Sequence, residues 1–251
     1  MSLSQQRILI IGGSNGMGLA AAQRLAALQA DVMIVGRSQE KLDKALSAIE
    51  GPAAAYVADF TDAQSLGALF QRVGHIDHLV LAASSSAAWG PFSSVGATAL
   101  RGALEGKLLG YWQTLQAALP HLRRDGSVVM LSGAASRTAM PGTAGLAAVN
   151  GAITQMAQTL AKELAPLRVN VVSPGLVDTP AYEGMPADGK AAMFAGAARS
   201  LPVGRTGTSD DIAEAIVYLL GNGFTTGALL DVDGGARMAG SGSMNGDQSP
   251  A

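Results

Sequence analysis

The stretch Arg7-Ile-Leu-Ile-Ile11-Gly-Gly-Ser-Asn-Gly16-Met-Gly18 decides the fold. After Arg7 it begins with a continuously apolar run, which is typical of a short strand covered on both faces. The glycines allow a tight turn and a close backbone approach, and the free N–H groups that open the next helix attract an anion. The stretch therefore predicts a strand, a phosphate-binding turn and a helix from residue 16. A tight turn without a ligand is the alternative.

The end of the second predicted strand bears on which dinucleotide would bind. It reads Val35-Gly36-Arg37-Ser38, without the carboxylate that would hold the two ribose hydroxyls of NAD. An uncharged strand end followed by a guanidinium suits a 2′-phosphate. The sequence therefore favours NADP(H) over NAD(H), with a solvated Arg37 at a helix start as the alternative.

Short apolar runs alternate with longer helical segments along the chain. This alternation predicts one α/β domain, a doubly wound parallel (Rossmann-type) sheet of about seven strands with helices on both faces. Strands are expected at Arg7–Ile11, Asp31–Val35, Ala53–Ala58, His78–Ala82, Ser127–Leu131, Arg168–Val172 and Ala228–Val232, and helices at 16–29, 38–49, 62–73, 97–122, 144–165 and 208–221.

The domain is expected to cover residues 1–238. Prolines and glycines interrupt the alternation over 179–202, beside the carboxyl ends of the strands, where a substrate lid would lie. Residues 239–251 are rich in Gly and Ser, which predicts a flexible C-terminal tail.

Composition excludes several classes of function. The net charge of −2 provides no basic field for nucleic acid, and the absence of Cys excludes disulfides and thiolate chemistry. His75 and His78 lack the further ligands of a metal site, so no metal is expected. The polar start and short apolar runs predict a cytoplasmic protein without a targeting signal or membrane span. Only 14% of residues are charged, against about 25% in an average protein, which suggests surface buried between subunits.

Several motifs together resemble the short-chain dehydrogenase/reductase family over nearly the whole chain. The glycine turn resembles that family's TGxxxGxG, and Asp59 resembles its adenine-contacting Asp. Asn170-Val-Val-Ser-Pro174-Gly175 with Thr179 resembles its nicotinamide-side segment, and Asp231-Val-Asp-Gly-Gly235 its closing motif. The resemblance implies an NAD(P)(H) site formed by Gly12, Ser14, Asn15, Gly16, Met17, Gly18, Arg37, Ser38, Asp59, Phe60, Ala82, Ala83, Pro174, Gly175, Val177 and Thr179.

The family's catalytic residues are replaced in this chain. Aligned on the flanking motifs, its Tyr falls on Leu146, its Lys on Asn150, its Ser on Gly133 and its helix Asn on Lys107. The segment after the fourth strand reads Leu-Ala-Ala-Ser84 in place of the family's Asn-Asn-Ala-Gly. A leucine cannot donate a proton, and such transfer contributes about 10²–10⁴ in rate, so ordinary carbonyl reduction should be severely impaired.

Lys107 and Asn150 look like an exchange of two groups that are near neighbours in the family. The exchange would keep an ammonium near the cofactor. The alternative is that the two substitutions arose by chance in a site that is no longer under constraint. Lys107, Asn150 and the adjacent Ser132 are the catalytic candidates. Tyr111 and Tyr182 are further possible proton donors, or packing residues.

Two functions follow from this pattern. The first is NADPH-dependent reduction of a small carbonyl substrate through an atypical site. The second is a catalytically impaired NADP(H)-binding sensor, or a regulatory or structural subunit. Trp89, Met185, Met193 and Phe194 suggest a largely apolar substrate pocket. The family pairs the helices expected at 97–122 and 144–165, so a homotetramer or homodimer is expected.

Overall fold

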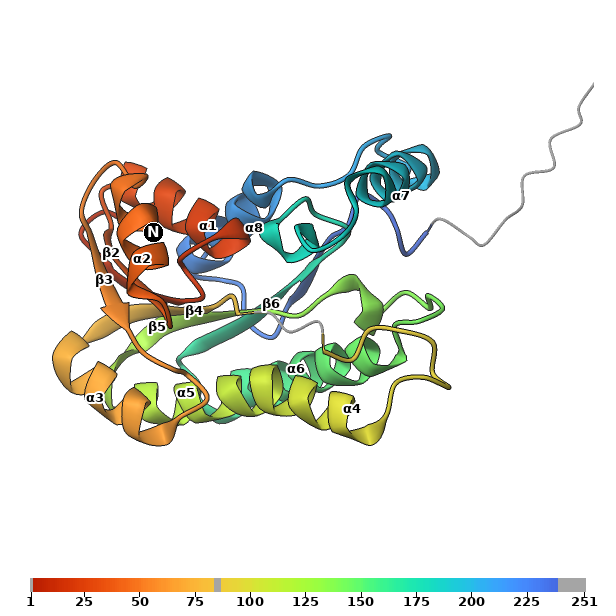
Figure 1. Cartoon of the computed structure of the whole chain (residues 1–251). Helices are drawn as coiled ribbons and strands as arrows, with labels where there is room; N and C mark the ends of the chain where they lie inside the picture. Colours follow the sequence, from red (N-terminus) through yellow and green to blue (C-terminus); the bar gives the residue numbers. More distant parts are fainter. Residues whose placement is uncertain (1, 84–86, 239–251) are drawn as a thin grey trace, which may run out of the picture.

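The computed structural model describes residues 2–83 and 87–238, in which seven parallel strands form one sheet in the order β3-β2-β1-β4-β5-β6-β7 (Figure 1). Because β4 pairs with β1 on the side opposite β2, the chain reverses its winding there, and this confirms the predicted doubly wound fold. The strands are β1 Arg7–Ile11, β2 Asp31–Gly36, β3 Ala53–Val57, β4 Ile76–Leu81, β5 Leu122–Leu131, β6 Arg168–Pro174 and β7 Leu229–Val232.

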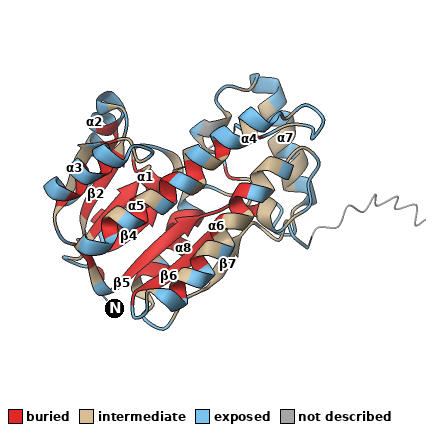
Figure 2. Cartoon of the chain, turned by 90° about the horizontal axis from the view of Figure 1, so that it is seen from below, coloured by how far each residue is buried: buried red, intermediate tan, exposed pale blue. Residues whose placement is uncertain are grey.

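Helices cover both faces of the sheet because the strand side chains alternate between two apolar layers. On β1, Ile8 and Ile10 pack in the layer formed with α1 Gly16–Ala27, α2 Gln39–Ser47 and α8 Ser209–Gly221. Leu9 and Ile11 pack in the layer formed with α3 Ala63–Val73, α5 Gly110–Ala118 and α6 Ala144–Glu163. Figure 2 shows most of the interior strands and the inner helix faces as buried, whereas the outer strands β3 and β7 are not buried. Both faces of β1 are therefore apolar, as its continuous hydrophobic run predicts.

The helix predicted over 97–122 is wrong in its interior and at its end. The segment consists of α4 Ala97–Ala103, a π-helical turn η1 Leu104–Leu109, α5, and a 3₁₀ turn η2 Leu119–His121. Pro120 lacks the N–H that would continue the helix. Strand β5 then begins at Leu122, which pairs with Ile76 of β4, and Arg123 donates hydrogen bonds to Asp77 (2.9 Å) and Gln6 (2.8 Å) beside this pairing.

The predicted lid segment contains the short turn η4 Pro180–Tyr182 and the helix α7 Ala187–Ser200. No residue of α7 is buried among the residues described, so this helix stands at the periphery of the domain (Figure 1). The predicted tail at 239–251 lies outside the described residues. Across the described chain, no helix is both long and apolar enough to cross a membrane.

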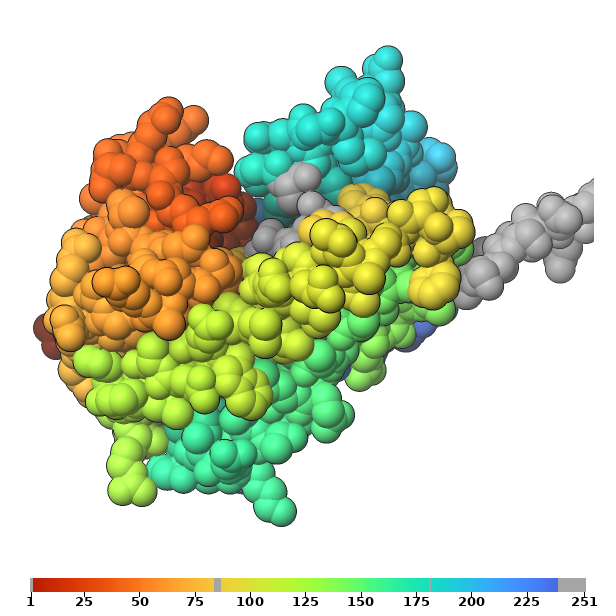
Figure 3. Space-filling model, turned by 60° about the horizontal axis from the view of Figure 1, so that its bottom comes forward, coloured from red at the N-terminus to blue at the C-terminus, as the bar shows by residue number. Residues whose placement is uncertain are grey.

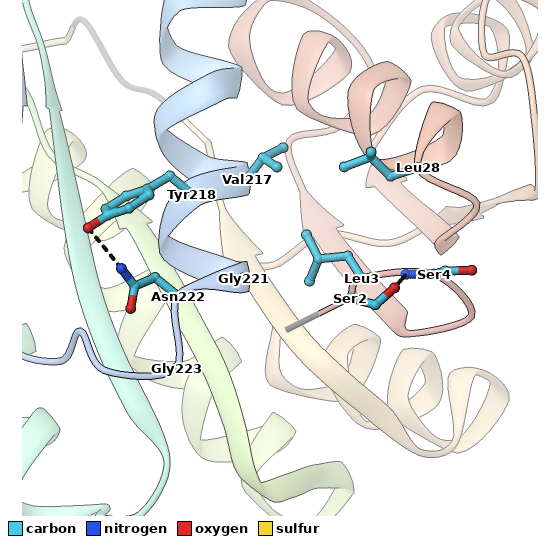
Figure 4. A pocket seen from close by; sticks show the side chains of 9 residues that line it. All are labelled: Ser2, Leu3, Ser4, Leu28, Val217, Tyr218, Gly221, Asn222 and Gly223. Atoms are coloured by element: carbon cyan, nitrogen blue, oxygen red, sulfur yellow. Dashed lines mark hydrogen bonds between the residues drawn. The ribbon is translucent and has the colours of Figure 1, made fainter.

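A hollow of about 590 Å³ lies at the amino end of the sheet (Figure 4). Leu3, just before β1, and Leu28, just after α1, line it together with Tyr218 and Gly221 of α8. The glycine turn follows the opposite end of β1. This hollow is therefore separate from the site described below.

Candidate active site

The glycine turn is packed tightly between two other strand ends. Gly12 has a φ of 84°, and a Cβ there would come within 2.8 Å of the Ala83 nitrogen and 3.1 Å of the Ala82 oxygen. Gly16 has a φ of 51°, and a Cβ there would lie 3.6–3.7 Å from Thr179 and Pro180. Side chains are strained at both positions, so glycine brings together the ends of β1, β4 and the segment after β6.

The first turn of α1 offers uncapped backbone N–H groups. Asn15 occupies the N-cap position, but its side chain makes no capping hydrogen bond. The α1 dipole and these free donors suit a phosphate at that point. Among the predicted cofactor residues, Met17 packs in the α1 layer and Gly175 lies against Asp233, where a Cβ would come within 2.6 Å. Pro174 ends β6 beside this contact.

The end of β2 faces the end of β3. Arg37 is exposed, and its charge contributes to lowering the pKa of Asp59, after the larger effect of hydrogen bonds from Thr61. Ser14 Oγ lies beside Gly36, within 3.2 Å of where a Cβ would stand. Ser38 caps α2 by accepting a hydrogen bond from the Lys41 N–H (3.3 Å). Arg37 is thus an exposed cation just after β2, close enough to Asp59 for its charge to act on that carboxyl.

Two predicted cofactor residues have packing contacts of their own. The Phe60 ring lies directly over Gly110 of α5, where a Cβ would overlap the ring. Val177 is buried and forms an isolated β-bridge with Gly207. Neither contact has a local signal in the sequence, because the two residues of each contact are distant along the chain.

Lys107, Asn150 and Ser132 meet at the carboxyl end of β5. Lys107 Nζ, from η1, donates hydrogen bonds to Asn150 Oδ1 of α6 (2.7 Å) and to the Ser132 carbonyl oxygen (2.9 Å). All three residues are buried, and burial lowers the pKa of Lys107 to about 7. An ammonium that titrates near neutrality is well matched to proton transfer. Ser132 participates through its carbonyl oxygen, whereas its hydroxyl is enclosed without a partner among the described residues.

The other possible proton donors differ in their surroundings. Tyr111 is fully buried, and its hydroxyl donates to the Ala83 carbonyl oxygen (2.8 Å). Burial raises its pKa well above the ordinary value, so it remains a neutral phenol. Leu146 lies one turn before Asn150 on α6 and brings only an apolar side chain. Ser84 lies outside the described residues.

Aromatic side chains join the lid segment to the chain beyond β4. The Tyr182 ring meets Trp89 edge-on at 6.1 Å and Phe194 of α7 at 5.4 Å between centroids. Lys190 of α7 pairs with Asp178 at 2.7 Å. Figure 3 shows a notch between the orange-red surface of the N-terminal part of the chain and the cyan surface of this lid segment. Sequence reasoning noted Trp89 and Phe194 as apolar but missed the Asp178–Lys190 pair, which no local spacing indicates.

His75 and His78 are possible metal ligands by residue type. Among the described residues, no group of three or more His, Asp or Glu side chains could hold a metal ion. His78 is buried, and its pKa falls to about 4, chiefly because burial disfavours its charged form.

Comparison with known proteins identifies the family. The model of a family described as Enoyl-(Acyl carrier protein) reductase matches residues 12–237. A short-chain dehydrogenase/reductase, ATR9 of Stachybotrys chlorohalonatus, is 33% identical over 92% of this chain and 96% of its own length. The chain is a short-chain dehydrogenase/reductase.

Other relatives of this short-chain dehydrogenase/reductase agree with the assignment. A cis-4-hydroxycyclohexanecarboxylate dehydrogenase of Sinomonas cyclohexanicum is 31% identical over 93% of this chain and 97% of its own. A crystal structure of a small-chain dehydrogenase in complex with NADPH has a TM-score of 0.82 and 33% identity, covering 94% of this chain and 100% of the other. The fold is thus that of a nicotinamide-cofactor oxidoreductase.

Proposed function

We propose that this short-chain dehydrogenase/reductase reduces a small carbonyl compound with NADPH, through a site in which Lys107 and Asn150 stand where the family has its helix Asn and its Lys. The direct contact between Lys107 and Asn150 at the end of β5 carries this proposal. A drifting site would not be expected to keep a buried ammonium with two well-aligned acceptors, since removing a lysine from water is costly.

The cofactor would lie across the carboxyl ends of the strands. The uncapped start of α1 and the glycines of the turn would hold the pyrophosphate, and Arg37 the 2′-phosphate. The bound NADPH would supply a hydride. The structural relative that contains NADPH supports this choice of cofactor. Residues 82–83 and 174–179 would border its nicotinamide end, and of these Ala82, Ala83 and Thr179 already lie against the glycine turn.

Lys107 would be the source of the proton. An ammonium has three N–H groups, and two of them are used by Asn150 and Ser132. The third would deliver a proton to the oxygen on which charge develops. Without a tyrosine at Leu146, Lys107 is the buried titratable group of the cluster whose pKa is near neutrality.

The lid segment would contribute to substrate binding, and the outer helices would form the interface between subunits. Trp89, Tyr182 and Phe194 form an aromatic wall that suits a largely apolar substrate. Leu109 and Trp112 are half-exposed on the outer side of η1 and α5, which supports a homodimer or homotetramer formed through these helices. The composition supports a cytoplasmic protein without nucleic-acid partners.

Cofactor titration and a carbonyl panel test the proposal. NADPH and NADH are titrated by fluorescence, and NADPH oxidation is then followed with aldehydes, ketones and quinones. We expect NADPH to bind more tightly, and turnover that Lys107→Ala abolishes while NADPH still binds. NADPH binding without turnover over the whole panel would instead favour a sensor or a regulatory subunit. Turnover that survives Lys107→Ala would remove Lys107 from the mechanism.

A further inference from the structure

The side-chain amide of Asn150 occupies the space above Gly133. A Cβ at Gly133 would come within 2.8 Å of Asn150 Nδ2 and 3.4 Å of its Cγ. The φ of Gly133 is 171°, an extended conformation that any residue adopts, so only the amide restricts this position. The amide nitrogen therefore stands where the first atoms of a side chain from position 133 would be.

The hydrogen bond from Lys107 fixes which way the amide points. An ammonium only donates, so Asn150 must present its oxygen to Lys107 and its NH₂ group to the other side. Asn150 is only 7% exposed, yet its Nδ2 has no hydrogen-bond partner among the described residues. That nitrogen is also not one of the fully enclosed polar atoms that lack a partner, so it is not sealed within the core.

The neighbouring groups cannot serve as this donor. The Ser132 hydroxyl is enclosed, and the Tyr111 hydroxyl already donates to Ala83. Leu146 has no polar atom. Within the described part of the cluster, Asn150 is thus the side chain with an unused neutral donor beside the end of β5.

We propose that the Asn150 Nδ2–H group donates a hydrogen bond to the carbonyl oxygen of the substrate, and that Lys107 positions this amide. This inference rests on the proposed function. The carbonyl carbon would accept the hydride of the reduced nicotinamide, and the C=O π pair would move to oxygen. The amide N–H would stabilise that oxyanion, which would then take a proton from the Lys107 ammonium and leave a neutral amine. Gly133 makes room for the donor.

Paired variants at the two positions test the donor. Asn150→Asp keeps an acceptor for Lys107 but removes the N–H, and Asn150→Ala removes both. We expect each to lower kcat by about 10²–10³, as for the loss of an oxyanion donor.

Gly133→Ser alone should also lose activity, because its Cβ meets the amide. Gly133→Ser combined with Asn150→Ala returns a hydroxyl to the vacated space and should recover at least tenfold over Asn150→Ala. Gly133→Ala with Asn150→Ala is the matched control without a donor and should not recover.

A binding measurement separates this inference from the proposed function. With NADP⁺ bound no hydride is available, so [2-¹³C]acetone can be observed by NMR without turnover. A donated hydrogen bond moves the carbonyl ¹³C resonance downfield. We expect that shift in the wild type and in Gly133→Ser/Asn150→Ala, but not in Asn150→Asp or Gly133→Ala/Asn150→Ala.

The outcomes are distinct. A wild type that shifts the resonance but reduces nothing would retain the donor and overturn the proposed function. If the wild type turns over, and Asn150→Asp keeps both the wild-type kcat and the resonance shift, the proposed function stands and the Asn150 donor is overturned. A wild type with no shift at saturating acetone would also overturn the donor.

Discussion

Asn150 Oδ1 lies 2.7 Å from Lys107 Nζ, and this contact joins helix α6 to the π-helical turn η1. A π-helical turn within an α-helix is uncommon and is often found at functional sites. Here it carries the buried lysine of the candidate active site. The ammonium has neutral acceptors only, so its protonation depends on burial rather than on a nearby carboxylate.

The rate of reduction should fall as the pH rises through about 7. Burial lowers the pKa of Lys107 to that value, and only the ammonium can deliver a proton. The check is a pH profile of kcat between pH 5.5 and 9 with the best carbonyl of the panel. A kcat that stays constant up to pH 9 would show that another group supplies the proton.

Lys107→Met should stabilise the cofactor-free protein at neutral pH. The pKa of Lys107 is lowered on folding, so between pH 7 and 10 the unfolded chain binds more protons and the wild type gains stability as the pH rises. The advantage of the variant should therefore shrink by up to about 1.4 kcal/mol per pH unit over this range. Urea unfolding at pH 7, 8.5 and 10 measures it. Lys162→Met, at the exposed end of α6, is the control and should show no such trend.

Arg37→Ala should weaken NADPH binding by about 1.5–3 kcal/mol, the contribution of a hydrogen bond to a charged group. NADH affinity should hardly change, because NADH lacks the 2′-phosphate. Calorimetric titration of both cofactors provides the comparison. Lys41→Ala removes another exposed cation one turn away on α2 and should affect both affinities little. Equal losses for the two cofactors in Arg37→Ala would mean that Arg37 does not contact the 2′-phosphate.

Phe194→Ala should raise the KM for an apolar carbonyl substrate with little change in NADPH affinity. The ring packs on Tyr182 within the aromatic wall of the lid and lies far from the predicted phosphate sites along the chain. Aromatic pairs of this kind contribute about 0.5–1.5 kcal/mol, so a several-fold rise is expected. Asp188→Ala, exposed on the same helix, serves as the comparison. An unchanged KM would place the substrate elsewhere.

Trp112→Glu should dissociate the proposed oligomer. Trp112 is 49% exposed on the outer side of α5, and a buried carboxylate in an apolar interface is unfavourable. Sedimentation velocity at micromolar concentration compares this variant with Phe224→Glu, which alters a fully exposed aromatic residue after α8. A wild type that sediments as a 25.3 kDa monomer would refute the oligomer itself.

The fold could be predicted from the sequence because its signals are local. The apolar run at Arg7–Ile11 predicted the bounds of β1, and the glycines after it predicted the turn that the structure shows. The start of β5 could not be predicted in this way. Arg123, Arg124 and Asp125 are polar, and the strand includes them because Leu122 pairs with Ile76 of β4 before the register shift, where Arg123 also bonds to Asp77.

The candidate site could be predicted only in part, for the same physical reason. The resemblance predicted that Lys107 lies near Asn150, and the structure places Lys107 Nζ in hydrogen-bond contact with Asn150 Oδ1. It did not indicate that the Asn150 amide lies over Gly133, since the two positions are 17 apart in the sequence and a turn lies between them. Nor could it show that Ser132 meets Lys107 through its backbone oxygen, because a carbonyl is common to every residue type.

The amide above Gly133 also couples three positions of the site to one another. A serine at position 133 would bring its Cβ within 2.8 Å of the Asn150 nitrogen. A lysine at position 150 would lie beside the ammonium of Lys107, and two adjacent ammonium groups repel each other. The effect of a substitution at position 133 or 150 therefore depends on the residues at the other two positions, so substitutions at positions 107, 133 and 150 are expected to be non-additive.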